Sequence, residues 1–288
     1  MIIAHTDPAR FKDASNVHGG AGTIRIMSLL EKPTFQTPWL FIHRAVLLPG
    51  SGIGHHAHDT CEEMFTILDN AACFTHNGNT AEVRGAAMVP CRKGESHGIY
   101  NHTSQDTQFM NFCVLSPGGS YDCRDFNDNL INAKPGSIEE VPVRWVDRRL
   151  LTYTDQPAHQ GRGRIGIRGL WTHEDFKTTW GFIHHLLISP RCSIGYHRHE
   201  TIEECYMVLA GRGRVTVDDE TRCIGVGDAV LNRLGGAHGV YNDGHMPLEL
   251  LNMAVCLEKG KFDAVDLGDD LAERRVKVLD GEVTEPLG

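Results

Sequence analysis

The 288-residue sequence predicts an all-β protein made of two similar modules in tandem. Two observations lead to this fold class. The chain repeats itself at a fixed spacing of 141 positions, and in each copy short apolar runs alternate with turns rich in glycine, asparagine and aspartate. No segment longer than about two helical turns has the apolar period of ~3.6 residues of an amphipathic helix. Such a series of short strands is typical of an antiparallel sandwich or barrel with few helices.

The repeat covers most of the chain. Identical residues recur 141 positions apart in the pairs Trp39 and Trp180, His56 and His197, Glu63 and Glu204, and His97 and His238. Residues 18–122 align with residues 159–263 without a gap, which chance matches would not do. We therefore divide the chain into an N-terminal domain (1–122), a linker (123–158), a C-terminal domain (159–263) and a tail (264–288), with at most a short helix over residues 265–277.

Strand signals appear in both copies. Residues 38–52, PWLFIHRAVLLPGSG, form an apolar run that ends in a Pro-Gly turn. Residues 62–68 (EEMFTIL) and 203–217 (EECYMVLAGRGRVTV) alternate as strands do, and the second segment turns at Gly-Arg-Gly. The local pattern therefore agrees with the fold class that the repeat suggests.

Composition excludes several classes of protein. Apolar residues make up 41% and charged residues 23% of the chain, as in a globular protein with a core. The net charge of −9 argues against nucleic-acid or anionic-membrane partners, and no stretch approaches the ~18 apolar residues of a membrane span. The N-terminus has no signal-peptide pattern, and the nine cysteines include no CxxC pair. We therefore expect a cytoplasmic protein with reduced thiols.

The spacing of histidines and glutamates predicts a metal site in each copy. Side chains two positions apart on a strand share a face, so His56 and His58 point the same way. Glu63 shares its face with apolar residues and projects into the interior, where an unpaired carboxylate is costly and a cation removes that cost. The same arrangement recurs in the second copy, so that the candidate ligands are His56, His58, Glu63, His97, His197, His199, Glu204 and His238.

Three imidazoles and one carboxylate form a donor set for a divalent transition metal. Iron, manganese, nickel, cobalt and zinc all suit this set, and up to two ions can bind per chain with positions open for water or substrate. Glu62 and Glu203 adjoin the ligand glutamates, and strand alternation turns them outward or toward the mouth of the site. They become the ligands only if a shorter spacing applies.

Through these residues, each half of the chain resembles a cupin domain. The residues of the C-terminal copy that fit the two cupin motifs are His197, His199, Glu204, Gly211, Gly227, Gly235, His238 and Asn242. Those of the N-terminal copy are His56, His58, Glu63, Gly94, His97 and Asn101, with Asn70 at the turn glycine and Gly85 one position out. The resemblance implies a bicupin, which is two tandem double-stranded β-helix barrels, with complete metal-ligand motifs in both.

The chain departs from the cupin pattern at two arginines. Arg92 and Arg233 stand where the second motif has proline. If they face the pocket, they can hold a substrate carboxylate in a bidentate pair, and otherwise they lie in an exposed turn.

Other repeated residues are candidates for the walls of the pocket. His43 and His184 are either acid–base groups near the metal or packed histidines. Asn111 and Asn252 interrupt apolar strands, and either contact a metal-bound water or substrate or are satisfied amides in the barrel wall. The residues that share a face with the ligand glutamates are Phe65 and Tyr206.

The leading hypothesis for function is a metal-dependent bicupin enzyme that acts on a small oxygenated molecule, such as a carboxylate, diketone or diol. The three-histidine, one-glutamate set resembles that of cupin dioxygenases, of oxalate-decarboxylase-type bicupins with manganese and of cupin sugar isomerases with zinc, and among these metals iron or manganese is expected first. We favour dioxygenase chemistry over an isomerase, lyase or decarboxylase of the same fold, and the short lid region and the lack of an extended N-terminal arm argue against a full oxalate decarboxylase. The second hypothesis is a non-catalytic bicupin that binds a small molecule. Exposed sheet edges make a homodimer or another homo-oligomer plausible in either case.

Overall fold

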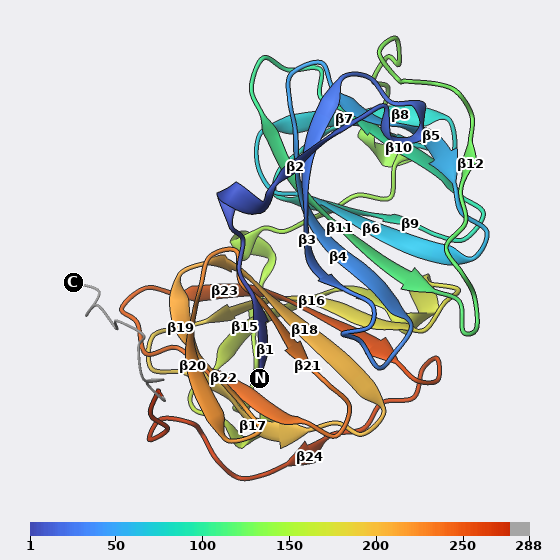
Figure 1. Cartoon of the computed structure of the whole chain (residues 1–288). Helices are drawn as coiled ribbons and strands as arrows, with labels where there is room; N and C mark the ends of the chain where they lie inside the picture. The colour runs from blue at the N-terminus through green and yellow to red at the C-terminus, as the bar shows by residue number, and fades with distance from the viewer. Residues whose placement is uncertain (277–288) are drawn as a thin grey trace.

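The computed structural model describes residues 1–276, which form two β-barrels stacked one above the other in Figure 1. Each barrel consists of a seven-stranded and a five-stranded sheet with antiparallel neighbours. This arrangement confirms the predicted all-β fold class and the tandem pair of barrels.

The N-terminal barrel contains twelve of the strands. Its larger sheet has the order β13-β9-β6-β11-β4-β3-β2, and its smaller sheet has the order β12-β5-β10-β7-β8. The strands are β2 (Lys12–Ser15), β3 (Thr23–Glu31), β4 (Trp39–Leu47), β5 (Gly52–Ala57), β6 (Cys61–Ile67), β7 (Ala71–His76), β8 (Asn79–Arg84), β9 (Ala87–Cys91), β10 (Ser96–Tyr100), β11 (Thr107–Leu115), β12 (Arg124–Asp125) and β13 (Arg144–Trp145).

The C-terminal barrel has the same plan. Its larger sheet has the order β1-β21-β18-β23-β16-β15-β14, and its smaller sheet has the order β20-β19-β22-β17-β24. The strands are β1 (Ile2–Ala4), β14 (Thr152–Tyr153), β15 (Ile165–Thr172), β16 (Trp180–Ile188), β17 (Ser193–Arg198), β18 (Ile202–Ala210), β19 (Arg212–Val217), β20 (Glu220–Gly225), β21 (Ala229–Asn232), β22 (Ala237–Tyr241), β23 (Leu248–Cys256) and β24 (Val265–Asp266).

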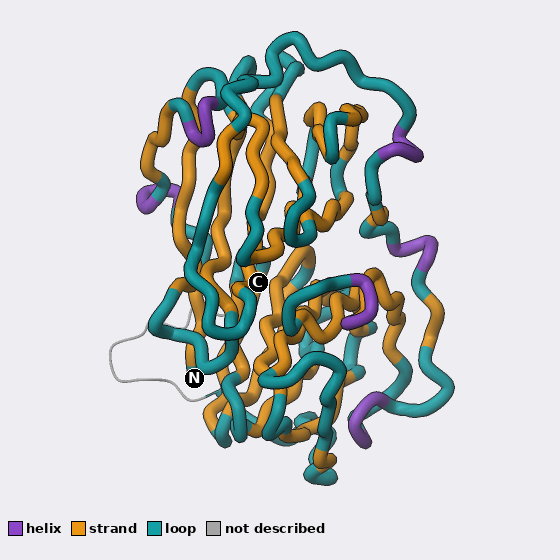
Figure 2. Tube along the Cα trace, turned by 90° about the vertical axis from the view of Figure 1, so that its right-hand side faces the viewer, coloured by secondary structure: helices purple, strands orange, loops and turns teal. Residues whose placement is uncertain are grey.

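Helical structure within residues 1–276 is limited to short 3₁₀ turns in the loops, drawn purple in Figure 2. In that described part, no helix has the length and apolarity needed to cross a membrane. The turns are η1 (Pro8–Arg10), η2 (Val17–Gly19), η3 (Ile138–Glu140), η4 (Arg148–Leu150), η5 (Ala158–Gln160) and η6 (His173–Asp175).

The short helix expected over residues 265–277 is not found in its described part. Val265 pairs with Arg198, and Asp266 with His197, so the chain adds the edge strand β24 to the smaller C-terminal sheet. Backbone pairing with a preformed sheet edge thus prevails over the weak local preference for helix. Residue 277 and the rest of the tail lie outside the described residues.

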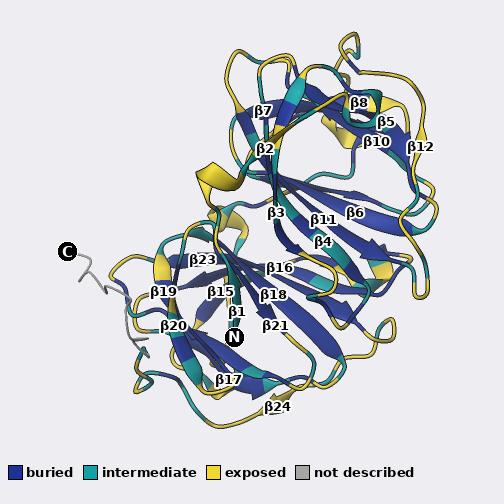
Figure 3. Ribbon diagram, in the orientation of Figure 1, coloured by how far each residue is buried: buried dark blue, intermediate teal, exposed yellow. Residues whose placement is uncertain are grey.

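Three hydrophobic cores organise the molecule. One fills the N-terminal barrel around Phe65 and Phe109, and a second fills the C-terminal barrel around Tyr206 and Val240. The third lies between the barrels, where the buried rings of Trp39 and Trp180 meet edge to face with centroids 4.8 Å apart. The larger sheets therefore have a buried surface on both faces, dark blue in Figure 3.

Strand β6 illustrates this two-sided burial. All seven of its residues are buried. Phe65 packs in the N-terminal barrel, whereas Met64 packs in the core between the barrels. Because both faces of β6 are buried, most of its residues are apolar rather than alternately apolar and polar. Its two adjacent glutamates, Glu62 and Glu63, are therefore buried as well.

The boundaries of the two barrels differ from those that the sequence repeat suggests. Strand β1 pairs with β21, so residues 2–4 lie in the larger sheet of the C-terminal barrel. Within the linker, β12 and β13 pair with the N-terminal barrel, and β14 pairs with the C-terminal barrel. The division into independent domains at residues 122, 158 and 263 stays a prediction.

Candidate metal centres

The structure brings each predicted ligand set together. The candidate nitrogen and oxygen atoms of each set all lie within 4.8 Å of one another, and all eight side chains are buried. The two clusters consist of His56, His58, Glu63 and His97 in the N-terminal barrel and of His197, His199, Glu204 and His238 in the C-terminal barrel. Their role as metal ligands stays a prediction.

The strand register explains how the clusters form. His56 on β5 pairs directly with His97 on β10, and His197 on β17 pairs with His238 on β22. Glu63 comes from β6 in the other sheet of its barrel and meets the histidines across the interior. Each cluster therefore joins the two sheets of its barrel.

Backbone carbonyls orient the imidazoles. Nδ1 of His56 lies 2.8 Å from the carbonyl oxygen of Gly54, and Nδ1 of His197 lies 2.8 Å from that of Gly195. A carbonyl can only accept, so Nδ1 of each ring donates its hydrogen and Nε2 keeps a lone pair. Metal-binding histidines are commonly oriented in this way.

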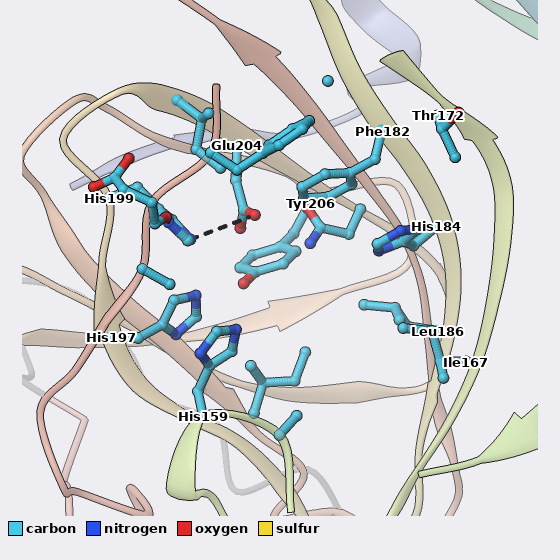
Figure 4. A pocket seen from close by; sticks show the side chains of 18 of the residues that line it. His159, Ile167, Thr172, Phe182, His184, Leu186, His197, His199, Glu204 and Tyr206 are labelled. Atoms are coloured by element: carbon cyan, nitrogen blue, oxygen red, sulfur yellow. Dashed lines mark hydrogen bonds and ion pairs between the residues drawn. The ribbon is translucent and has the colours of Figure 1, made fainter. Parts of the chain in front are cut away.

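Unsatisfied atoms show that the clusters fit a cation. Nε2 of His58 and Nε2 of His199 are buried without a hydrogen-bond partner. They lie 3.7 Å from a carboxylate oxygen of Glu63 and 3.6 Å from one of Glu204, respectively (Figure 4 shows the second pair). A divalent ion between these atoms would satisfy both, and imidazole with carboxylate is a donor set for iron, manganese, cobalt, nickel or zinc.

The protonation states of His56 and Glu63 in the N-terminal cluster agree with this assignment, whereas His58 must lose a proton to bind a metal. Burial and the nearby His97 lower the pKa of His56 to about 2. Burial raises the pKa of Glu63, but its hydrogen bond with His97 and the charges of the other histidines hold it well below its usual range. Burial also opposes the charge on His58, although contacts with Cys61 and Glu63 raise its pKa to about 9. Metal binding would therefore displace a proton from His58.

A cavity of ≈ 680 Å³ opens onto the C-terminal cluster (Figure 4). Three of the four ligand candidates, His197, His199 and Glu204, line it. His184 lies across the cavity from His197, as Figure 4 shows. The size is within the range of small-molecule sites.

His43 and His184 occupy equivalent places beside the clusters. The ring of His43 stacks on Phe41 with centroids 3.9 Å apart, and that of His184 stacks on Phe182 at 4.3 Å. Burial lowers the pKa of both histidines, so both are neutral near pH 7. His184 lines the C-terminal cavity. An acid–base role thus has a geometric basis for His184 and stays a prediction for both.

The two asparagines also lie close to the clusters. Asn111 Nδ2 donates to Oε2 of Glu63 at 3.1 Å, which fixes that carboxylate. Asn252 lines the C-terminal cavity, and its Oδ1 is buried without a partner. The Oδ1 atom of Asn111 is likewise buried without a partner, so the two asparagines differ in that Asn111 binds Glu63 through its nitrogen and Asn252 lines the cavity.

Phe65 and Tyr206 differ between the barrels at one equivalent position. Tyr206 lines the C-terminal cavity, and its hydroxyl is buried without a hydrogen-bond partner. Burial and the neighbouring Glu204 raise the pKa of Tyr206 well above its usual value, so the hydroxyl keeps its hydrogen. Phe65 packs against His97 with ring centroids 5.6 Å apart and offers no such donor.

Neither arginine lines the C-terminal cavity. Arg92 reaches the other barrel, where its Nε donates to the carbonyl oxygen of Asp175, and it pairs with Glu95. Arg233 is exposed. Each arginine lies in a turn directly after the end of a strand, β9 or β21. The structure gives no support for a substrate-binding role, and Arg233 lies in an exposed turn, as in the second of the two alternatives.

Glu62 and Glu203 are not directed to solvent or to the mouth, as strand alternation led us to expect. Both side chains are fully buried between the barrels. Glu62 accepts hydrogen bonds from the backbone nitrogen of Lys177 at 2.8 Å and from Thr178. Glu203 accepts the equivalent bonds from the backbone nitrogen of Gln36 and from Thr37. Their carboxylates are thus engaged away from the clusters, which also argues against the alternative in which they are the ligands.

Sequence reasoning overlooked His18 and His159. His18 stacks on His56 with centroids 3.9 Å apart, and His159 stacks on His197 at 3.7 Å. The backbone at His18 passes close to that of Gly54 on β5, because a Cβ on Gly54 would lie 2.1 Å from the carbonyl oxygen of His18. The signal was present, since the two histidines recur at the 141-residue spacing outside the ligand motifs.

Comparison with known proteins agrees with this architecture. A family model described as "Cupin domain" matches residues 184–254. An oxalate-binding protein from Thermotoga maritima is 31% identical over 101 residues, which cover 35% of this chain and 84% of that protein.

Solved structures extend the likeness in fold to most of the chain. Oxalate decarboxylase from Bacillus subtilis superposes with a TM-score of 0.61 at 15% identity, covering 92% of this chain and 78% of that chain. Salicylate 1,2-dioxygenase from Pseudoaminobacter salicylatoxidans superposes with a TM-score of 0.65 at 11% identity, covering 80% of this chain and 73% of that chain. At these identities the likeness concerns the fold and not the reaction.

Proposed function

Because this chain belongs to the cupin family and contains two tandem cupin barrels, we propose that it is a metal-dependent enzyme acting on a small oxygenated molecule. One observation carries the proposal: a buried cluster of three histidines and one glutamate opens onto a cavity of ≈ 680 Å³. A donor set that leaves coordination positions open beside a cavity is suited to catalysis rather than to a purely structural ion.

Each side chain of the C-terminal site has a distinct proposed role. The four ligands are His197, His199, Glu204 and His238. When bound, the metal supplies a Lewis acid, and in the case of iron also a partner for dioxygen. Neutral His184 accepts or returns a proton across the cavity, and Asn252 Oδ1 accepts a hydrogen bond from the substrate.

Iron and manganese are the metals we favour. The donor set suits both metals. Oxalate decarboxylase from Bacillus subtilis, which has a similar fold, contains Mn(II) centres. We favour dioxygenase-type chemistry over an isomerase, lyase or decarboxylase, because the cavity is far larger than a two-carbon acid requires. A small-molecule substrate, a cytoplasmic location and a homodimer stay predictions.

A binding protein without catalysis is the second candidate. It is favoured by one observation, the 31% identity to a protein named as oxalate-binding. In this function the metal would fix an anionic ligand in the cavity and no bond would change.

Metal analysis followed by turnover assays tests the proposal. Protein purified without chelator or affinity nickel is expected to contain about two equivalents of iron or manganese per chain, because both clusters offer four ligands. The iron form is then expected to consume dioxygen with at least one member of a panel of diketones, catechols and keto acids.

The result that contradicts the enzyme proposal is a metal-loaded chain that binds members of the panel and transforms none of them. That outcome supports the binding protein. A His197→Ala/His238→Ala double variant, which removes two ligands of the C-terminal cluster, serves as the negative control for turnover.

A further inference from the structure

The two metal clusters are nearly alike, but one aromatic side chain lies differently over them. In the N-terminal barrel, the ring of Tyr121 lies 5.0 Å from the ring of His58, and its electrostatic neighbours include Glu63. The equivalent residue of the C-terminal barrel is Phe262, which instead packs on His173 with centroids 5.4 Å apart. The ring of Tyr121 therefore lies against a ligand candidate of the first cluster, whereas Phe262 packs on His173 and lines the cavity beside the second.

One smaller residue, Gly181, also makes room at the C-terminal site. Gly181 lines the cavity where the N-terminal barrel has Leu40. A Cβ at Gly181 would approach Cε1 of Phe262 to 3.1 Å, so even this atom would disturb the wall. Leu40 packs with the buried Cys61 and Cys113 in the first barrel. These substitutions explain why a cavity reaches the second cluster.

The cavity wall is mainly apolar, although Thr172, His173, Glu174 and His184 line it in addition to the metal-ligand candidates. Its side walls include Ile165, Ile167, Leu186 and Phe182. Among the described residues, those that line the cavity include no lysine or arginine. A second carboxylate far from the metal would therefore find no cation to neutralise it, and its desolvation would be unfavourable.

Charge balance at the metal limits the ligand in the same way. A divalent cation held by Glu204 retains one positive charge in a buried site. A ligand with one negative charge at its metal-binding end neutralises that site. A ligand with two negative charges leaves the buried site with a net charge of minus one. Tyr206 offers its unpaired hydroxyl hydrogen at the same end of the cavity (Figure 4).

We propose that the C-terminal barrel, and not the N-terminal barrel, receives the organic ligand, and that this ligand is a mainly apolar molecule ending in a pair of oxygens with at most one negative charge. Tyr206 donates a hydrogen bond to one of these oxygens. The inference rests on the proposed metal-dependent function and adds the site and the class of molecule to it.

The test uses the full chain loaded with Co(II), whose visible spectrum reports a change of ligand at the metal. Calorimetric titration with 1-phenyl-1,3-butanedione is expected to show one equivalent bound per chain with a change in the cobalt spectrum. Binding is expected to be at least ten-fold tighter than that of oxalate, since a phenyl ring gains from burial in the apolar cavity.

Variants distinguish the two barrels. Ile167→Trp fills the cavity and is expected to weaken diketone binding at least ten-fold with cobalt content unchanged. The same change at the equivalent position of the other barrel, Ile26→Trp, is expected to leave the affinity unchanged. Tyr206→Phe is expected to weaken binding about five-fold, the usual effect of one lost hydrogen bond.

The outcomes separate this inference from the function on which it rests. A chain that takes up no cobalt contradicts the proposed metal sites themselves. A cobalt-loaded chain that binds two diketones, prefers oxalate, or loses affinity in Ile26→Trp but not in Ile167→Trp contradicts the present inference and leaves metal binding intact.

Discussion

Substitution of single side chains tests the proposed metal site of each barrel. His238→Ala removes one of the three imidazoles of the C-terminal cluster and leaves the buried Glu204 short of a partner. We expect the metal content to fall from about two equivalents per chain to about one, because an incomplete donor set loses most of its affinity. His97→Ala is expected to do the same for the N-terminal cluster, as measured by elemental analysis of the purified variants.

The control is His245→Ala, because His245 is exposed and lies outside both clusters. This variant is expected to keep the full metal content. If His238→Ala also keeps it, the C-terminal cluster is not a metal site.

At this scale the sequence predicted which residues would meet, but not all of their surroundings. The eight candidate ligands could be found because period-two alternation and the repeated spacing define one face of each strand. The positions of Arg92 and Glu62 could not be found in this way. Alternation tells which face of a strand a residue occupies, but not whether a second barrel covers that face.

Among the elements, the loops before β4 and β16 hold the two barrels together through reciprocal contacts. Glu62 accepts three hydrogen bonds from Lys177 and Thr178, and Glu203 is bonded equivalently to the loop that contains Thr37. Glu62→Gln keeps the shape but replaces an accepting oxygen with an amide that faces other donors. We expect a loss of about 1–3 kcal/mol in the free energy of unfolding, measured by urea denaturation.

Glu203→Gln is the matched variant, because it is equally buried and bonded to the equivalent loop of the other barrel. The two variants are expected to lose similar stability, whereas Glu139→Gln on the exposed turn η3 is expected to change little. Unchanged stability of both buried variants would show that these contacts do not contribute to the association of the barrels.

For the whole molecule, the shared core predicts that the barrels unfold together. Trp180 is fully buried and packs on Trp39 and Phe176 between the barrels. Trp180→Ala is expected to lower the free energy of unfolding by about 3–5 kcal/mol, because it removes a large side chain and leaves a cavity. Differential scanning calorimetry is expected to show one transition for the natural chain and one, at lower temperature, for the variant.

The half-exposed Trp145 provides the control, and Trp145→Ala is expected to have a much smaller effect. Two separate transitions in the natural chain would contradict the view that the core between the barrels couples them. The repeat predicted two barrels but not this coupling, because a pattern of apolar residues does not reveal which barrel surface meets which.

The pairing of β1 with β21 has a consequence for how this protein is synthesised and inherited. Ile2–Ala4 leave the ribosome long before their partner strand at residues 229–232, so the first strand has no place to dock while the N-terminal barrel forms. The edge of the last barrel is closed only when the two distant segments meet. A gene fragment encoding the second repeat alone would therefore produce a barrel with an uncovered edge, open to association with other chains. The two repeats are thus not interchangeable as separate folding units, since the second depends on residues that precede the first.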